Sequence, residues 1–261
     1  MKENIGILLP YKDQFIKDNA GSASIWVKDF SRKSIYKKSI TVFGYTPETK
    51  KLIKGIKYKN LSFSSFGLKS KNAKYVEKFI SYLKKKSFSI IEVHNRPSYI
   101  NIINKSVQNK KYVLIIHNNP LSLRGAVTIS ERQKLLKLCS KIIFVSNWVK
   151  EKFFEGLDFK NHEKCQVIHP SIDKIKKLPK KENLITFVGK LNHSKGYDTF
   201  GRAIIRILKR YKNWKSIVIG DEPREKYNFK HNRLLHLGWI THDQTMNIYK
   251  KSSISVVPSH W

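Results

Sequence analysis

The chain has 261 residues, 40% of them hydrophobic and 12% aromatic, which is enough for one large core or two cores of ordinary size. Its formal net charge is +33, and no apolar run reaches the length of a membrane-spanning helix. This composition excludes global disorder, and the charge favours an anionic partner.

The basic excess is mostly lysine, because only nine of the 52 basic residues are arginine. Readout of bases and phosphates in nucleic acids favours arginine, so no nucleic-acid partner is expected. We assign part of the charge to a compositional bias and the rest to an anionic membrane surface. Cys139 and Cys165 are predicted to be buried thiols in a reducing compartment, and no metal site is expected. Without a signal-peptide pattern, the predicted location is cytoplasmic, with peripheral contact at the inner face of the cell membrane as the second option.

The first part of the chain alternates short apolar runs with amphipathic segments, which predicts strands alternating with helices. A strand at 5–10 is followed by Ala20-Gly21-Ser22 and a helix. This order can bring backbone amides to an anion at Gly21. The expected strands are 5–10, 40–43, 55–59, 88–93, 112–116, 141–145 and 165–168, and the expected helices are 72–86, 98–108, 130–139 and 148–154.

Two successive strands of this series each deliver a histidine at their carboxyl end. His94 follows the strand at 88–93, and His117 with Asn118 follows the strand at 112–116. In doubly wound sheets, ligands bind outside the carboxyl ends of the strands, so these residues are candidate ligand contacts. The alternative is that each histidine is only a hydrogen-bonded loop residue; the repetition argues against it, most of all for His117.

A second series of strands and helices begins after a lysine-rich segment that contains Pro179. Its first strand, 184–188, ends at Gly189 and leads through Lys190 and Lys195 into a helix at 197–211. A glycine turn and a helix start flanked by cations can hold a diphosphate. The alternative is an ordinary loop with solvated lysines. Further strands are expected at 216–219, 234–237 and 253–257, and a helix at 241–250.

The two series predict an α/β protein with two Rossmann-like doubly wound domains whose carboxyl edges face each other. The predicted boundaries are 1–173 for the first domain, 174–183 for the linker and 184–261 for the second domain.

Several segments, in this order, resemble family 4 glycosyltransferases of the GT-B fold. Those in the second half are Phe187-Val188-Gly189-Lys190-Leu191 with Lys195-Gly196, Ile219-Gly220-Asp221-Glu222-Pro223, Leu237-Gly238-Trp239, and Val257-Pro258-Ser259 with Trp261. Those in the first half are Ala20-Gly21, His117, Ile142 to Ser146 and Val167 to Asp173. The resemblance implies a retaining enzyme that transfers a sugar from a nucleotide-sugar donor to a hydroxyl acceptor, with no cofactor and no metal.

The resemblance also implies roles for individual residues. Lys190 and Lys195 would bind the donor diphosphate, with Gly189 and Gly21 allowing the backbone to approach it. His117 would line the reacting centre as the catalytic residue, and His94 and Asn118 would contact the sugar or the acceptor. The implied setting is cell-surface polysaccharide or lipopolysaccharide synthesis, with a lipid-linked or saccharide acceptor.

The sequence departs from the family pattern in four places. Lys190 stands where arginine is usual, the first loop has one glycine of two, and the chain ends at Trp261 before the family's two donor-binding glutamates. In a fourth place, His169-Pro170-Ser171 replaces the common Pro-Asn-Gly. We therefore expect a truncated sequence with a complete acceptor-side domain and a partial nucleotide-sugar-binding domain. The alternatives are a basic nucleic-acid-binding protein and an inactive glycosyltransferase fragment. A dinucleotide-dependent oxidoreductase is disfavoured because no glycine fingerprint is present.

Overall fold

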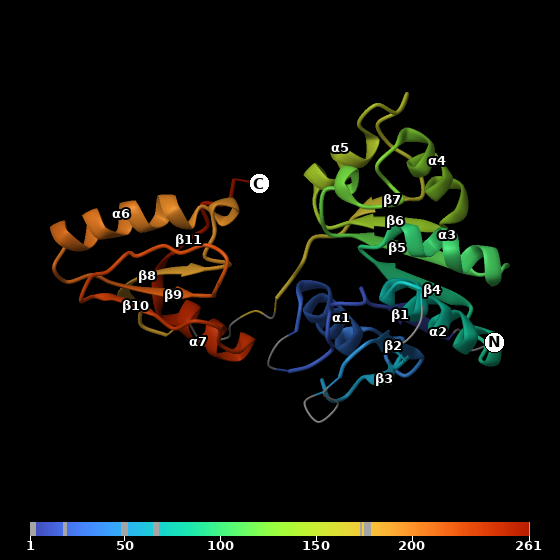
Figure 1. Ribbon diagram of the computed structural model, residues 1–261, viewed down its shortest axis with the longest axis horizontal. Coiled ribbons are helices and arrows are strands. Elements are labelled where there is room, and N and C mark those ends of the chain that lie inside the picture. Colours follow the sequence, from blue (N-terminus) through green and yellow to red (C-terminus); the bar gives the residue numbers. More distant parts are fainter. Residues whose placement is uncertain are drawn as a thin grey trace. The chain divides into compact units, whose positions relative to one another are not determined.

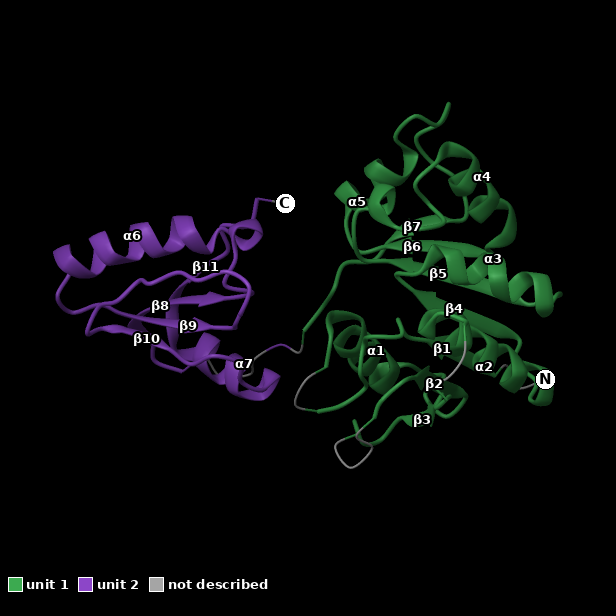
Figure 2. Cartoon of the chain, in the orientation of Figure 1, with its two compact units in different colours: residues 1–172 green, residues 173–261 purple. Residues whose placement is uncertain are grey.

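The computed structural model describes residues 4–17, 20–47, 52–64, 68–172, 174 and 179–260. The chain forms two compact units, residues 1–172 and residues 173–261 (Figure 2). Asp173, residues 175–178 of the predicted linker, and Trp261 lie outside the described residues.

The first unit is built on a parallel sheet of seven strands in the order β3-β2-β1-β4-β5-β6-β7 (Figure 1). Parallel neighbours need crossover connections, and the amphipathic segments between the strands supply them as helices. The strands are β1 Ile5–Leu8, β2 Ile40–Gly44, β3 Lys57–Asn60, β4 Ile90–His94, β5 Lys111–Ile116, β6 Lys141–Phe144 and β7 Cys165–Val167. The helices are α1 Ser22–Lys33, α2 Lys71–Lys85, α3 Pro97–Ser106, α4 Ile129–Leu138 and α5 Asn147–Phe154, with a short 3-10 turn, η2, at Pro120–Ser122.

The two faces of this sheet carry different cores. The larger core joins α2, α3, α4 and α5 to side chains such as Val93 on β4 and Leu114 on β5. The smaller core joins α1 to β1 and β2 through residues such as Val27 and Val42. Because side chains alternate along a strand, the residues that flank Val93 point to the face that α1 covers.

The second unit has a four-stranded parallel sheet in the order β10-β9-β8-β11. Figure 1 shows α6 along one side of these strands and α7 along the other. The elements are β8 Glu182–Val188, η3 His193–Lys195, α6 Tyr197–Arg210, β9 Lys215–Ile219, β10 Leu234–His236, α7 His242–Lys251 and β11 Ser252–Val256. The core of this unit forms where Phe200, Ile204 and Leu208 of α6 pack on Ile185 and Phe187 of β8.

The expected element types are confirmed along the chain, with boundaries that move by a few residues. Strand β8 starts at Glu182, inside the segment predicted as a linker. Cys139 and Cys165 are both free and buried, as predicted. Burial raises the pKa of the Cys139 thiol to about 12 and that of Cys165 to about 11. In the described part of the chain, the helices are all too short or too polar to cross a bilayer.

Candidate functional site

The carboxyl ends of β4 and β5 hold a hydrogen-bonded row of three side chains. Glu92 and His94 are two residues apart on β4, so both point to the face opposite Val93. The Nε2 atom of His94 lies 2.7 Å from Oε1 of Glu92, and its Nδ1 atom lies 3.0 Å from Nε2 of His117. The His94 ring is fully buried and the Glu92 side chain is 18% exposed. The two histidines predicted from the sequence are therefore in direct contact.

His117, like Glu92 at the other end of the row, is partly accessible to solvent. Burial lowers the pKa of His117 to about 3, and the neighbouring His94 adds to the shift. At neutral pH the ring is therefore uncharged, with one protonated nitrogen and one that accepts a hydrogen bond.

Asn95 fixes the loop that follows β5. It has a φ of +51°, in the left-handed region that asparagine tolerates better than most residues. Its Oδ1 atom accepts hydrogen bonds from the backbone N–H groups of His117, at 3.2 Å, and Asn118, at 3.3 Å. Asn118 itself is exposed, next to His117. Asn95, which follows β4, thus anchors the backbone that follows β5.

Trp26 of α1 packs against the rings of both His94 and His117. Its ring lies edge-on to His94 at 5.2 Å and to His117 at 6.0 Å, and it stacks on Phe30 at 3.9 Å between centroids. Its indole Nε1 atom is buried and has no hydrogen-bond partner among the described residues. An indole N–H is a donor only, so this group is an unsatisfied buried donor.

The turn before α1, where Gly21 was predicted to admit a phosphate, contains a carboxylate of the chain itself. Oδ2 of Asp13 accepts a hydrogen bond of 3.2 Å from the backbone N–H of Ala23. A Cβ atom on Gly21 would lie 2.4 Å from Oδ1 of Asp13, so glycine is required for this close approach. The positive end of α1 thus faces an internal anion.

The turn after β8 brings together the other predicted residues. The stem of Lys195 lies beside Gly189, with its Cγ atom 3.8 Å from the position of a Cβ on that glycine. Lys190 is exposed and Lys195 is half-buried. In the part of the chain that the structure describes, neither ammonium group has a hydrogen-bond or ion-pair partner, whereas Lys190 is close enough to the Glu222 carboxylate to influence its titration.

Backbone amides in this second turn are largely bonded within the chain. The side chain of Asn192 accepts from Lys195 N at 3.1 Å, and its carbonyl accepts from Tyr197 N at 3.2 Å. The N–H of His193 donates to Glu225 at 2.9 Å. The sequence predicts that helix N-terminal amides contribute to anion binding here. In the structure, these amides bond within the chain, and the lysine ammonium groups are the ones without a partner among the described residues.

The glycine turn after β9 lies directly against the turn after β8. Gly220 has a φ of +128°, and a Cβ on it would lie 1.9 Å from the carbonyl oxygen of Gly189. Beside it, the guanidinium of Arg224 donates two hydrogen bonds, of 2.7 and 2.8 Å, to the carboxylate of Glu222. This pairing lowers the pKa of the Glu222 carboxyl to about 2, so it is an anion at neutral pH.

One group of side chains in the second unit has the types that bind metals. The ligand atoms of His193, Asp198 and His260 lie within 4.8 Å of one another. Asp198, however, already accepts a hydrogen bond of 3.0 Å from Arg202. That bond uses Oδ2 of Asp198, whereas Oδ1 lies 3.4 Å from Nδ1 of His193 and has no hydrogen-bond partner among the described residues.

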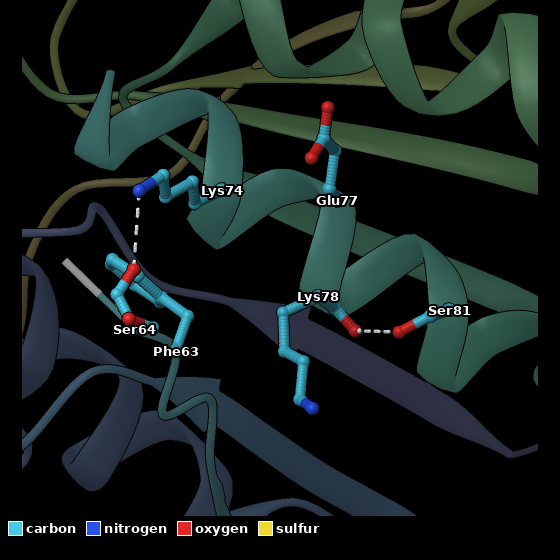
Figure 3. A pocket seen from close by; sticks show the side chains of 6 residues that line it. All are labelled: Phe63, Ser64, Lys74, Glu77, Lys78 and Ser81. Atoms are coloured by element: carbon cyan, nitrogen blue, oxygen red, sulfur yellow. Dashed lines mark hydrogen bonds between the residues drawn. The ribbon is translucent and has the colours of Figure 1, made fainter. Parts of the chain in front are cut away.

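A shallow depression on the first unit lies between α2 and the segment after β3 (Figure 3). Lys74 donates there to the carbonyl of Ser64 at 3.2 Å, and Ser81 donates to the carbonyl of Lys78 at 2.9 Å. None of the residues predicted from the sequence as site residues lines it, so it is separate from the candidate site. Its lining residues are Phe63, Ser64, Lys74, Glu77, Lys78 and Ser81.

The structure therefore forms two groups from the predicted residues, one in each unit. His94, His117 and Asn118 form the first, and Gly189, Lys190 and Lys195 form the second. Gly21 lies one turn before Trp26, at the start of the helix that covers the histidines. Sequence reasoning missed Glu92, Asn95 and Trp26. An acidic residue two positions before a strand-end histidine, inside an apolar strand, was the available signal for Glu92.

Comparison with known families matches both parts of the chain. The profile of the family described as Glycosyltransferase Family 4 matches residues 38–175, and that of Glycosyl transferases group 1 matches residues 169–261. The candidate glycosyltransferase YtcC of Bacillus subtilis is 24% identical over 221 residues, which cover 72% of this chain and 53% of YtcC. The uncharacterized glycosyltransferase MJ1607 of Methanocaldococcus jannaschii is 30% identical over 86 residues, covering 30% of this chain and 22% of that protein. The matches thus span about half or less of these relatives.

Solved structures share the fold at low sequence identity. Alr3699/HepE of Anabaena, in complex with UDP-glucose, matches with a TM-score of 0.65 and 14% identity, covering 98% of this chain and 74% of that one. The catalytic domain of starch synthase IV from Arabidopsis thaliana, bound to ADP and acarbose, matches with a TM-score of 0.69 and 11% identity, covering 99% and 78%. These similarities identify the fold as GT-B.

Proposed function

Because the chain belongs to Glycosyltransferase Family 4, we propose that it takes part in glycosyl transfer from a nucleotide-sugar donor to a hydroxyl of a saccharide or lipid-linked acceptor. The proposed transfer retains the configuration at the sugar carbon. The bond between that carbon and the diphosphate breaks, the acceptor oxygen bonds to the same face, and the acceptor proton passes to the leaving phosphate.

The observation that carries this proposal is the pair of open lysines in the turn after β8. Lys190 and Lys195 flank Gly189, and among the described residues no hydrogen bond or ion pair holds either ammonium group. A diphosphate placed there would gain two charge-assisted contacts. As the sugar–phosphate bond breaks, negative charge grows on the leaving group, and the same lysines stabilise it without a metal ion.

The histidine group supplies a second proposed contact. Neutral His117 at the edge of the first sheet has the character needed to bind a hydroxyl of the sugar or of the acceptor. Asn118, exposed beside it, is the second proposed contact on this loop.

We further propose a role at the cytoplasmic face of the cell membrane, in cell-surface polysaccharide or lipopolysaccharide synthesis. The net charge of +33 supports this setting, because a basic surface is attracted to anionic lipids that surround a lipid-linked acceptor.

Binding of UDP-glucose and of UDP to the 261-residue chain, measured by isothermal titration calorimetry, tests the donor site. Lys195→Ala is expected to weaken UDP binding by about ten- to a hundredfold, because one charge-assisted contact contributes roughly 1.5–3 kcal/mol. Lys209→Ala is the matched control, since Lys209 is exposed at the end of α6 and away from the turn. Equal binding by both variants would show that the attraction comes from the overall charge and would reject the site.

A further inference from the structure

The row Glu92–His94–His117 is a continuous chain of two hydrogen bonds. We propose that Glu92 and His94 are positioning residues that keep His117 in the tautomer protonated on Nε2. His117 then presents unprotonated Nδ1 as a hydrogen-bond acceptor to a hydroxyl of the sugar or acceptor. The inference rests on the proposed function for the identity of that hydroxyl.

The direction follows from the donor and acceptor capacity of each group. An ionised carboxylate only accepts, so the hydrogen between Glu92 and His94 belongs to Nε2 of His94, across 2.7 Å. A neutral imidazole has one N–H, so Nδ1 of His94 carries a lone pair. The 3.0 Å contact to His117 then requires that Nε2 of His117 donate.

The proposed direction takes His94 as a neutral ring with a single N–H. The His94 ring is fully buried between the sheet and Trp26, and its second neighbour is another imidazole. If His94 carried a proton on both nitrogens, its bond to Glu92 would stay the same, but Nδ1 of His94 would donate to Nε2 of His117. Nδ1 of His117 would then carry the proton and become a donor.

Neighbouring residues hold the rings of His94 and His117 in place. Trp26 contacts both rings edge-on, and Asn95 anchors the backbone N–H of His117. Within the described residues, Nδ1 of His117 has no hydrogen-bond partner. Nδ1 of His117 is therefore the atom of this row that can accept a hydrogen bond from a ligand.

The tautomer can be measured directly by nuclear magnetic resonance on protein labelled with ¹⁵N in histidine. Long-range ¹H–¹⁵N correlation spectra distinguish a protonated ring nitrogen from one with a lone pair, and His117→Gln identifies the His117 signals among nine histidines. At pH 7 we expect His117 to show a protonated Nε2 and an unprotonated Nδ1. A protonated Nδ1 in the unaltered chain would overturn the proposal.

Glu92→Gln tests whether Glu92 sets the tautomer at a distance. The amide of glutamine either accepts from His94 or donates to it, so both directions of the row become available. We expect the His117 nitrogens to shift toward the values of a tautomeric mixture while the backbone spectrum stays folded. Glu77→Gln, at an exposed glutamate of α2 paired with Lys69, is the control and leaves the His117 signals unchanged. Unchanged His117 signals in Glu92→Gln would reject the role of Glu92.

A transfer assay separates this inference from the proposed function. With UDP-glucose as donor, Glu92→Gln is expected to lower kcat/KM by about tenfold or less, the effect of one misdirected neutral hydrogen bond. If the tautomer is as expected but no transfer to any acceptor is found, the positioning role stands and the proposed function fails. If transfer occurs but His117 is protonated on Nδ1, the proposed function stands and the positioning role fails.

Discussion

The turns after β1 and after β8 share a strand, a glycine and a following helix, but they differ in what faces the helix. In the first turn, the carboxylate of Asp13 bonds to the N–H of Ala23, and Gly21 makes room for it. In the second turn, the side chain of Asn192 bonds to the amide of Lys195, and the lysines are left open. A glycine at a strand-to-helix turn therefore indicates a close approach, while the neighbouring side chains decide whether the partner is internal or a ligand.

The largest effect is expected from Gly196→Ala, which would disrupt the second turn. Gly196 has a φ of +66°, and a Cβ on it would lie 2.0 Å from the carbonyl oxygen of Pro258. We expect the free energy of unfolding of the second unit to fall by more than about 3 kcal/mol, because backbone strain and a clash with main chain add. Urea denaturation followed by tryptophan fluorescence measures it.

Gly238→Ala is the matched control for this change. Gly238 has nearly the same φ, +63°, but a Cβ there would meet nothing within 4 Å. The free energy of unfolding should fall only by the cost of placing alanine at a positive φ, about 1 kcal/mol. If both variants lose the same stability, the close approach to Pro258 is not what requires glycine at position 196.

Acidification is expected to affect the first unit through His117. Its pKa is about 3 in the folded chain and near 6.5 when unfolded, so the unfolded state binds more protons between these values. Stability from this group is complete above pH 6.5 and falls as the pH is lowered towards 3, by at most about 1.4 kcal/mol per pH unit. The difference between the unaltered chain and His117→Asn, measured by denaturation from pH 7 to pH 5, isolates this contribution. A difference that does not change with pH would contradict it.

A smaller effect is expected from Asp13→Ala, which would make the first turn resemble the second. The variant loses a hydrogen bond to an N-terminal amide of α1 and a favourable charge at the positive end of the helix, so stability should fall by about 1 kcal/mol. Asp158→Ala, at an exposed aspartate, is the control. The vacated turn should also bind pyrophosphate more tightly than the unaltered chain does, which titration calorimetry can measure. Unchanged stability together with unchanged pyrophosphate binding would mean that the carboxylate does not occupy an anion site.

The smallest effect is expected from Lys190→Arg in the second turn. Arginine keeps the charge and adds a planar fork that can bind two phosphate oxygens, so UDP binding should strengthen by about two- to fivefold. Weaker binding would indicate that the nearby Glu222 captures the guanidinium, since that carboxylate already attracts Arg224.

The sequence predicted the order of strands and helices well because apolar periodicity reports burial directly. The core face of α2, including Tyr75, Phe79 and Leu83, is buried as its helical spacing indicates. In α1, the large apolar side chains of Ile25, Trp26 and Phe30 are only partly buried, whereas the buried positions include Ala23 and Val27. Periodicity cannot show that Trp26, which packs against the smaller core, also contacts two histidine rings.

Candidate site residues were predicted where the sequence places them at strand ends or at the starts of helices. His94 and His117 could be paired because parallel strands bring their carboxyl ends to one edge. The roles of Asp13 and Asn95 could not be predicted, because each depends on a contact between a side chain and a backbone amide more distant in the sequence. Such contacts follow from loop geometry, which residue patterns do not encode.

The two buried thiols have a practical consequence for following the motions of this protein. With pKa values of about 12 and 11, Cys139 and Cys165 hold about one thiolate in ten thousand molecules or fewer at pH 7. A cysteine introduced at an exposed position in each unit would therefore react with a maleimide dye far faster than either native thiol. The chain is in effect ready for two-colour fluorescence measurements of the distance between its units, with and without UDP, and needs no prior removal of cysteine.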